Sequence, residues 1–395
     1  MSLPLPEPFA QIPRYPLLYP HPSPIHPLPT LRDLTDPTYR RVSVFSKRED
    51  HSSPLACAGN KYRKLEYIIP DILSQTPQHH HHEHHPTSQP MRGPATTLIT
   101  EATHGGLGAA TPRDGGGLGA SSDPAAFERV GNVQINQLVG ALVDILDADD
   151  PVAEDATPVL EHLASCGRNP YWIPGGASLH PLGGLGYARA AVEIEAQEAQ
   201  LQLGGSGRYD YIFVACGSGS TVGGLIAGFT MLEKNRQAAV STPTSSGDQD
   251  STRAEGRLPP RNVIGVLTSP TKPRQYHEER VLTFARRAGA MIGLDAERDI
   301  SMEDVQLDDR FVGTAYGVLD PGTKETLQVM ARAEGMMLDP VYTAKAARGM
   351  MYWVVHGQAF ENYARKHNLD EVNVLFIHTG GQAALSAYAE GVKDT

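Results

Sequence analysis

The residues that decide the fold are YIFVACGSGST at positions 211–221, where an apolar run passes directly into glycines and hydroxyl residues. Its first part, Tyr211–Ala215, has the composition of a buried strand, and Val222–Leu232 after it is typical of a helix. A glycine-rich turn between a strand and a helix directs backbone N–H groups and hydroxyls toward one spot beside the positive end of the helix dipole. Phosphate is the natural ligand of such a turn, although glycine-rich turns without a ligand are also common. The spacing matches neither the P-loop nor the dinucleotide fingerprint, and the turn consists of Gly217, Ser218, Gly219, Ser220 and Thr221.

Strands and helices alternate over most of the remaining chain. Apolar, β-rich runs predict further strands at residues 42–45, 96–100, 171–173, 262–267 and 372–378. Helical spacing predicts helices at 61–73, 158–165, 183–198, 274–290, 323–334 and 343–355, a helix leading into a strand at 126–143, and a final helix after residue 381. This alternation favours an α/β fold with mostly parallel sheets. Residues 1–30 are rich in proline and are expected to form an extended arm on a domain surface.

Three segments lack the periodicity of either element. Residues 74–95 contain a histidine-rich tract at 79–85, residues 102–124 are dominated by glycine, and residues 241–261 are polar and rich in serine and proline. The first and third are expected to be disordered insertions and the second to be irregular. A histidine-rich tract can bind metal adventitiously, but nothing around this one predicts a defined metal site.

Composition argues against several classes of protein. The chain has 395 residues, and its 34 Lys and Arg against 45 Asp and Glu give a net charge of -11. A general nucleic-acid-binding protein needs clustered basic residues, so no nucleic-acid partner is expected. No apolar stretch is long enough to span a bilayer, and the N-terminus lacks the features of a secretory signal. With these signals missing and only 3 widely spaced cysteines, the protein is expected to be cytoplasmic.

A second candidate for chemistry is Lys61, within AGNKYRKL at positions 58–65. A lysine at the start of a helix is unfavourable for the helix dipole, which prefers anions there. Lys47, Arg63 and Lys64 stand close by, and crowded cations lower the pKa of a lysine. The neutral amine is the form that reacts with an aldehyde to give an imine. The segment therefore allows two interpretations, a reactive lysine or an ordinary surface lysine.

Motifs in a fixed order along the chain carry a resemblance to one group of enzymes. They are KRED at 47–50, GNK at 59–61, RKLEY at 63–67, GNVQ at 131–134, HPLGGLG at 180–186, GST at 219–221, YG at 316–317, EG at 334–335, LDPVY at 338–342 and HTGG at 378–381. With these motifs the chain resembles 1-aminocyclopropane-1-carboxylate deaminase and D-cysteine desulfhydrase. Both are pyridoxal-phosphate enzymes of fold type II, related to the tryptophan synthase β chain.

The resemblance implies an α/β fold of two open, twisted, mostly parallel sheets flanked by helices. Residues 1–63 and 166–395 would form the large cofactor-binding domain, and residues 64–165 a smaller, truncated domain. Pyridoxal 5′-phosphate would bond covalently to Lys61, which would then move a substrate proton. Tyr316 and Tyr342 would face the substrate, where a phenol can orient a carboxylate or assist proton transfer, with core packing as the alternative. The residues expected to bind the cofactor are Asn60, Lys61, Lys64, Gly217, Ser218, Gly219, Ser220, Thr221 and, near the pyridine nitrogen, Thr343.

Details of the sequence favour two different substrates. Deaminases of the bacterial type have glutamate where this chain has Thr343, whereas the desulfhydrases have threonine. KRED and PLGGLG favour the deaminase instead, and Ala58 replaces a glycine that is common in the family. The resemblance therefore implies a deaminase of small amino acids, acting on 1-aminocyclopropane-1-carboxylate to give 2-oxobutanoate and ammonia, with D-cysteine desulfhydrase as the alternative. Family members form dimers or larger assemblies, so a homo-oligomer is expected.

One block of the family is missing from the sequence. After the strand at 97–100, the family has a glycine-rich turn with Gln-Ser-Asn, whose serine is the proposed nucleophile or substrate contact and whose asparagine touches the cofactor ring hydroxyl. Here residues 101–104 lead straight into the glycine-rich segment, and no Ser-Asn pair occurs in the chain. The chain is then either a catalytically impaired cofactor-binding homologue or the product of an incomplete gene model. The small domain would expose apolar residues such as Val133, Leu138 and Leu142, and Ser121, Ser218 and Ser220 lie outside the matching motif.

Overall fold

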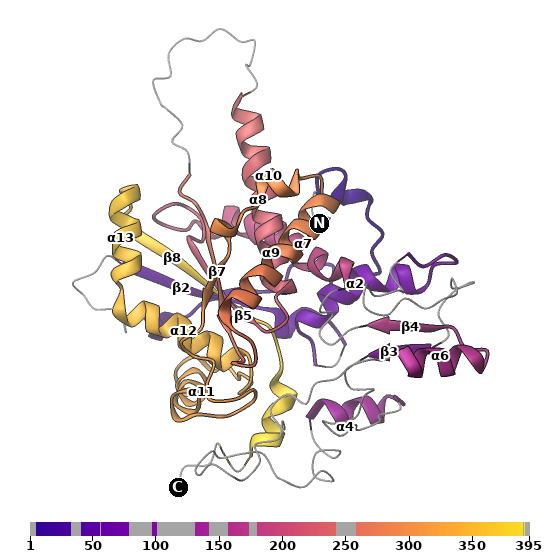
Figure 1. Ribbon diagram of the computed structural model, residues 1–395. Coiled ribbons are helices and arrows are strands. Elements are labelled where there is room, and N and C mark those ends of the chain that lie inside the picture. Colours follow the sequence, from indigo (N-terminus) through magenta and orange to yellow (C-terminus); the bar gives the residue numbers. More distant parts are fainter. Residues whose placement is uncertain are drawn as a thin grey trace.

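The main feature of the computed structural model is a six-stranded sheet with the order β1-β2-β8-β5-β6-β7 (Figure 1). The structure describes residues 5–32, 41–55, 57–78, 97–100, 131–141, 157–173, 180–241, 258–389 and 391. All neighbouring strands of this sheet are parallel except β1 and β2. The mostly parallel sheet predicted from the sequence is therefore confirmed. Its strands are β1 (Ile25–Pro27), β2 (Arg41–Arg48), β5 (Tyr211–Cys216), β6 (Asn262–Leu267), β7 (Gln306–Asp308) and β8 (Glu371–His378).

Helices cover both faces of the large sheet (Figure 1). On one side lie α7 (Leu185–Leu201), α8 (Ser220–Ser241) and α9 (Arg274–Met291), and on the other α11 (Pro321–Glu334), α12 (Thr343–His356) and α13 (Gln358–His367). Strand β5 shows why both faces are needed, because its side chains alternate between two apolar cores. Ile212 and Val214 belong to the core beneath α7–α9, and Tyr211 and Phe213 to the core beneath α11–α13.

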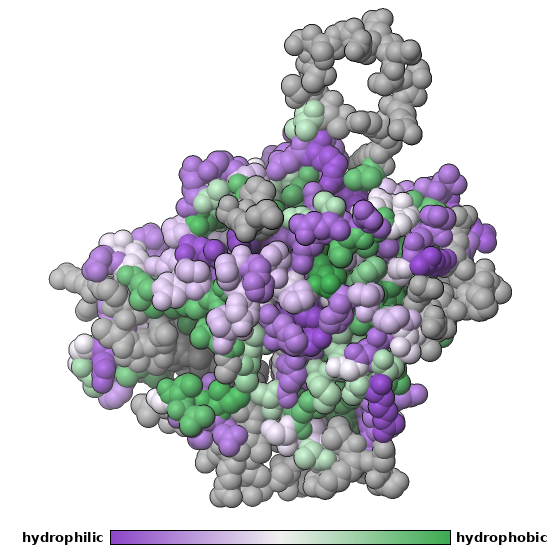
Figure 2. Space-filling model, turned by 180° about the vertical axis from the view of Figure 1, so that it is seen from behind, coloured by the Kyte–Doolittle hydropathy of each residue, from purple (hydrophilic) through white to green (hydrophobic). Residues whose placement is uncertain are grey.

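A two-stranded parallel sheet of β3 (Thr97–Thr100) and β4 (Pro170–Ile173) lies apart from the large sheet, with α4 (Gly131–Leu138) and α6 (Thr157–Ser165) near it (Figure 1). Strand β4 follows the predicted domain boundary after residue 165 and pairs with β3, which precedes it. The other predicted boundary, after residue 63, falls inside the continuous helix α2 (Asn60–Ile72). Leu138 of α4 is 84% exposed, and apolar side chains gather on this part of the surface (Figure 2, lower left).

The N-terminal segment differs from the predicted surface arm. It contains the short elements η1 (Phe9–Gln11) and α1 (Pro29–Arg32), and β1 pairs with β2 at the edge of the large sheet. Phe9, Leu28 and Leu31 are buried in the two cores. Proline excludes regular helix and central strand, as expected, but it leaves the apolar side chains between the prolines free to pack.

Short elements complete the described chain. They are η2 (Glu49–His51), η4 (Pro181–Gly184), α10 (Ala296–Asp299), η5 (Met302–Asp304) and η6 (Gln382–Tyr388). The final segment is thus a 3-10 helix, and the sequence did not predict α13, α10 or β7. The histidine-rich tract, the glycine-rich segment from 102 to 124 and residues 242–257 lie outside the described residues, as does the strand expected after α4. No described helix is long and apolar enough to cross a membrane.

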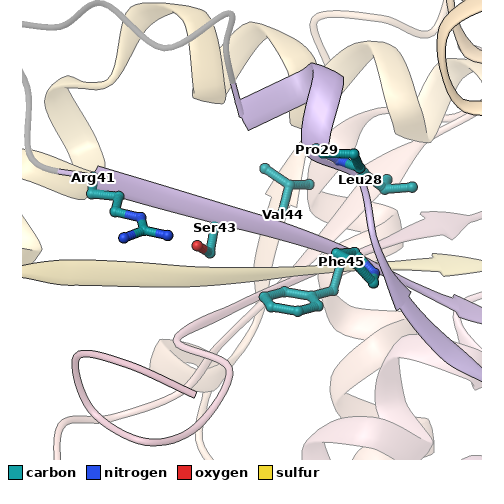
Figure 3. A pocket seen from close by; sticks show the side chains of 7 residues that line it. Leu28, Pro29, Arg41, Ser43, Val44 and Phe45 are labelled. Carbon is teal, nitrogen blue, oxygen red and sulfur yellow. The ribbon is translucent and has the colours of Figure 1, made fainter. Parts of the chain in front are cut away.

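A cavity of about 230 Å³ lies at the outer edge of the large sheet, between α1 and β2 (Figure 3). Its polar side chains are already engaged: Ser43 donates a hydrogen bond to Glu371, and Arg41 Nε lies 3.2 Å from Glu371 Oε1. The rest of the lining is apolar or proline, so the cavity offers no reactive group. It is lined by Pro27, Leu28, Pro29, Arg41, Ser43, Val44 and Phe45.

Candidate active site

The candidate site lies at the carboxyl edge of the large sheet. Strands β8, β5 and β6 are parallel neighbours, so the residues that follow them leave the sheet at the same edge. In open α/β sheets, ligands bind at this edge where the strand order changes direction. Here the chain passes from β5 to β6 and β7 on one side, while β8 and β2 lie on the other. The segments that meet there are 217–221 after β5, Thr268 after β6 and 379–381 after β8.

Lys61 is held at this edge by the start of α2. Gly59, just before the helix, packs against the backbone after β8: a Cβ atom at this position would lie 2.6 Å from the carbonyl oxygen of Thr379. The amide of Asn60 donates a hydrogen bond to the same oxygen at 3.1 Å. Only glycine allows so close an approach, which explains the residue before Asn60 and Lys61 in the motif.

Lys61 is accessible to solvent, yet enough protein surrounds its amine that desolvation lowers the pKa to about 8. One of the two interpretations from the sequence was a lysine with a lowered pKa, but for a different reason. Lys47 and Arg63 were expected to act as crowded cations, and both are instead paired with the buried carboxylates of Glu49 and Glu193. The lowered pKa agrees in direction with the reactive-lysine interpretation, and its cause is desolvation rather than charge crowding.

Lys64 links α2 to the turn after β5. It is buried one turn along the helix from Lys61, and burial, followed by the charge of Lys61, lowers its pKa well below the ordinary value. Cys216, the last residue of β5, also interacts electrostatically with Lys64. Burial raises the pKa of this thiol to about 12, so Cys216 is not a nucleophile. Lys61, Lys64 and the start of the glycine-rich turn therefore lie in one region.

The predicted phosphate turn has the expected form. Gly219 has a φ of 90°, and a Cβ atom there would lie 3.1 Å from Cγ2 of Val281 on α9, so the position favours glycine on both counts. Ser220 and Thr221 are buried in the first turn of α8, whose dipole directs its positive end toward the turn. The hydroxyl oxygens of Ser218 and Ser220 lie 3.1 Å apart.

Tyr342 and Tyr316 stand beside this turn. The ring of Tyr342 lies against Gly217, since its Cε1 atom is 3.5 Å from the Cβ position of that glycine. The hydroxyls of Tyr342 and Tyr316 are hydrogen-bonded to each other, and their rings meet edge to face with centroids 6.1 Å apart. The structure thus brings both predicted tyrosines to the glycine-rich turn.

Asp339 fixes the backbone that carries Tyr342 and Thr343. Its carboxylate accepts hydrogen bonds at 2.8 Å from the amides of Val341, Tyr342 and Thr343. The hydroxyl of Thr343 donates to Asp339 Oδ1 at 2.6 Å and accepts from the Asp339 amide at 2.7 Å. A hydroxyl has one proton, so Thr343 in this arrangement can only accept a further hydrogen bond.

The described residues fit a pyridoxal phosphate at this edge. Thr268 is fully buried, and its hydroxyl has no hydrogen-bond partner among the described residues. It lies 3.6 Å from the Cβ position of Gly217, at the start of the phosphate turn. A buried hydroxyl without a partner is costly unless a ligand satisfies it. Together with the amine of Lys61, this hydroxyl and the turn provide the groups that an aldehyde and a phosphate require.

Sequence reasoning missed three residues of this region. Asp339 stands inside a recognised motif but received no role, although its ability to cap the following amides could have been anticipated. Thr268 and Arg280 belong to no motif and come to the turn only through the packing of β6 and α9. Among the described residues no group of His, Cys, Asp and Glu could hold a metal ion.

Comparisons with known proteins show which family the chain is similar to. The family model described as "Pyridoxal-phosphate dependent enzyme" matches residues 17–380. The chain is 36% identical over 381 residues to the 1-aminocyclopropane-1-carboxylate deaminase of Burkholderia multivorans, covering 96% of this chain and 97% of the relative. It is 35% identical over 382 residues to the protein of the same name from Burkholderia lata, and the match covers 96% of this chain and 97% of that relative.

Solved structures give the same fold. One described as an ACC deaminase homologue has a TM-score of 0.66 and 25% identity, covering 97% of this chain and 96% of its own. The apo form of Escherichia coli diaminopropionate ammonia lyase has a TM-score of 0.52 at 16% identity, and the match covers 94% of this chain and 86% of the lyase chain. The second likeness bears on the fold alone.

Proposed function

Because this chain belongs to the pyridoxal-phosphate-dependent enzymes, we propose that it deaminates 1-aminocyclopropane-1-carboxylate. One substrate molecule and one water would give 2-oxobutanoate and ammonia. The observation that carries the proposal is the placement of Lys61, with its pKa lowered to about 8, at the sheet edge that also holds the glycine-rich turn. The similarity to the deaminases over 96% of the chain supports the choice of substrate.

We assign the roles of the site residues from their places at this edge. The cofactor, when bound, supplies the electron sink for cleavage at the substrate's α-carbon. Lys61 would carry it and, when released, move protons at the substrate. Tyr316 and Tyr342 share one hydrogen bond, so one phenol could orient the substrate carboxylate while the other holds a proton. The binding residues would be Asn60, Lys64, Gly217, Ser218, Gly219, Ser220, Thr221 and Thr343.

D-cysteine desulfhydrase activity is the second candidate, favoured by Thr343 in place of glutamate. D-cysteine and water would give a 2-oxo acid, ammonia and sulfide. The hydrogen bonds of Thr343 bear on this choice. Because its proton is donated to Asp339, the hydroxyl can accept only from a protonated ring nitrogen, the state that glutamate favours in the deaminases. The same hydrogen bonds would form in a desulfhydrase with this motif, so the choice of the deaminase rests on the similarity of the whole chain.

The missing Ser-Asn pair leaves a third candidate, a cofactor-binding protein without this activity. One experiment separates the three: the purified protein is given each substrate, and ammonia, 2-oxo acid and sulfide are measured beside the visible absorbance of lysine-bound cofactor. Ammonia and 2-oxobutanoate from 1-aminocyclopropane-1-carboxylate support the proposal. Sulfide from D-cysteine alone supports the desulfhydrase. Bound cofactor without product from either substrate overturns both activities.

The rate of cofactor attachment is expected to rise with pH, with a midpoint near 8. Only the neutral amine reacts with the aldehyde, and desolvation lowers the pKa of Lys61 from 10.5 to about 8, so the neutral form predominates above that pH. The measurement is the growth of visible absorbance after apoprotein and cofactor are mixed at pH values from about 6 to about 10. A midpoint at the ordinary lysine value would contradict the desolvation of Lys61.

Replacing Thr268 by valine is expected to weaken cofactor binding about tenfold to one-hundredfold, because a hydrogen bond to a charged group contributes roughly 1.5–3 kcal/mol. The thermal stability of the apoprotein should not fall, since the lost hydroxyl has no partner among the described residues. Equilibrium titration with the cofactor and thermal melts of the apoprotein measure the two effects. Thr283→Val, on the exposed face of α9, is the matched control. Lower apoprotein stability with unchanged affinity would show a purely structural threonine.

We also propose a cytoplasmic location, a small amino-acid substrate, no nucleic-acid or membrane partner, and a homo-oligomer. These proposals rest on sequence features and on the family, as does the division into a large cofactor-binding domain and a truncated small one. Light scattering of the purified protein tests the assembly. A monomer at micromolar concentration would contradict it.

A further inference from the structure

Arg280 of α9 lies beside the phosphate turn. Its neighbour Val281 packs directly on Gly219, whose Cβ position is 3.6 Å from the Val281 amide nitrogen and 3.7 Å from its Cα atom. The backbone of α9 therefore touches the middle of the turn, next to the residue that carries the guanidinium. The positive charge of Arg280 also acts on both Lys64 of α2 and Cys216, the residue just before the turn.

The side chain of Arg280 is half-buried and only partly used. Its Nη1 atom donates to the hydroxyl of Tyr276 at 3.2 Å, one turn earlier on α9. Its Nε atom is buried and has no hydrogen-bond partner among the described residues. The two carboxylates nearest in sequence are engaged elsewhere, since Glu278 accepts from Arg274 and Glu279 from Gln275.

A phosphate at this turn needs a permanent positive charge. A phosphate monoester carries a charge of about -1.5 to -2 at neutral pH. Lys64 is a weak source of compensating charge, because burial lowers its pKa well below the ordinary value. Arginine stays protonated when partly buried and presents several N–H donors in a fixed plane, which suits phosphate oxygens.

We propose that Arg280 binds the 5′-phosphate of the cofactor through its guanidinium group. The phosphate would then be held from three directions: by the turn at 217–221, by Lys64 from α2 and by Arg280 from α9. The inference rests on the proposed cofactor site at Lys61 and adds to it a ligand that lies outside every motif of the sequence. It also gives an acceptor to the Nε donor of Arg280, which is buried and has no hydrogen-bond partner among the described residues.

The test compares two aldehydes that differ only in the phosphate, pyridoxal phosphate and pyridoxal. Dissociation constants are measured with apoprotein by equilibrium titration, following the visible absorbance of lysine-bound aldehyde. Arg280→Gln is expected to weaken pyridoxal phosphate binding about tenfold to one-hundredfold and to leave pyridoxal binding unchanged. Arg280→Lys keeps the charge but loses the planar donors, so its dissociation constant for pyridoxal phosphate should lie between those of the wild type and Arg280→Gln. Arg274→Gln, on the exposed part of the same helix, is the matched control and should alter neither constant.

The outcomes separate this inference from the proposed function. If the wild-type protein binds both aldehydes through Lys61 and Arg280→Gln binds pyridoxal phosphate as tightly, Arg280 is not a phosphate ligand and the proposed function stands. Equal weakening for both aldehydes would also overturn the inference, because it shows a general effect on the site. If the wild-type protein binds neither aldehyde, the cofactor site and the inference fail together. Melting curves of the apoproteins show that each variant is folded.

Discussion

Lys61→Ala is expected to abolish covalent attachment of the cofactor and to lower kcat/KM by about a thousandfold or more. The amine at this position is both the attachment point and the proposed proton carrier, so its loss removes two functions at once. Lys61→Arg should fail as well, since a guanidinium keeps its charge and cannot become a nucleophile near pH 8. The measurements are the visible absorbance of the protein mixed with pyridoxal phosphate and the rate of ammonia release.

Lys234→Ala provides the control for Lys61→Ala, because Lys234 is an exposed lysine that pairs with Asp299 on another part of the chain. It should keep full absorbance and activity. One result would reassign the chemistry: a visible band that persists in Lys61→Ala and disappears when Lys64 is also replaced. Lys64 is buried with a lowered pKa, so it is the described amine best placed to act instead.

Sequence patterns were most reliable where local composition and tertiary burial agree. The strand predicted at 262–267 has the same bounds as β6, and the helix predicted at 61–73 differs from α2 by one residue at each end. Helix α13 was missed although Phe360, Tyr363 and Ala364 follow helical spacing, because polar residues dominate the segment. Strand β7 is only 3 residues long, too short for a periodicity to be recognised.

The residues of the candidate site fall into two groups, those that a short motif predicts and those that only tertiary packing brings to the site. Lys61 and the turn at 217–221 were predicted because a short sequence carries each of them completely. Thr268 and Arg280 could not be predicted, since each is a single residue brought to the turn by a different element. The cause of the low pKa of Lys61 was equally inaccessible, because sequence shows the basic neighbours but not the carboxylates that fold against them.

Those carboxylates form a buried ion cluster behind Lys61. Arg63 donates to Glu49 and Glu193, which are 0% and 6% exposed, with Nη2 lying 2.9 Å and 3.0 Å from their Oε1 atoms. Lys47 Nζ is 2.7 Å from Glu193 Oε1, so two cations balance two anions. The cluster joins β2, α2 and α7 and also holds Ser23 of the N-terminal segment. It fixes α2 only two residues beyond Lys61.

Arg63→Met is expected to destabilise the protein by about 3–5 kcal/mol, because it leaves a buried carboxylate without compensation. Adding Glu49→Gln should recover part of this loss, since the second change removes the unpaired charge. Denaturant unfolding of the two single variants and the double variant measures the coupling. Strictly additive losses would show that the charges do not act as one cluster. Lowered occupancy by the cofactor in Arg63→Met would further show that the cluster positions Lys61.

The same cluster predicts how the protein responds to acid. Burial alone would raise the pKa of Glu193, but the charges of Arg63 and Lys47 outweigh it and lower the pKa below its ordinary value of 4.5. A lowered folded-state pKa means that the stabilisation is complete above about pH 4.5 and is lost as the pH falls toward the folded-state value. In Arg63→Met that pKa should rise, so acid unfolding should begin at a higher pH than in the wild type. An unchanged onset in a pH titration followed by circular dichroism would mean that Arg63 does not stabilise the charged form of Glu193.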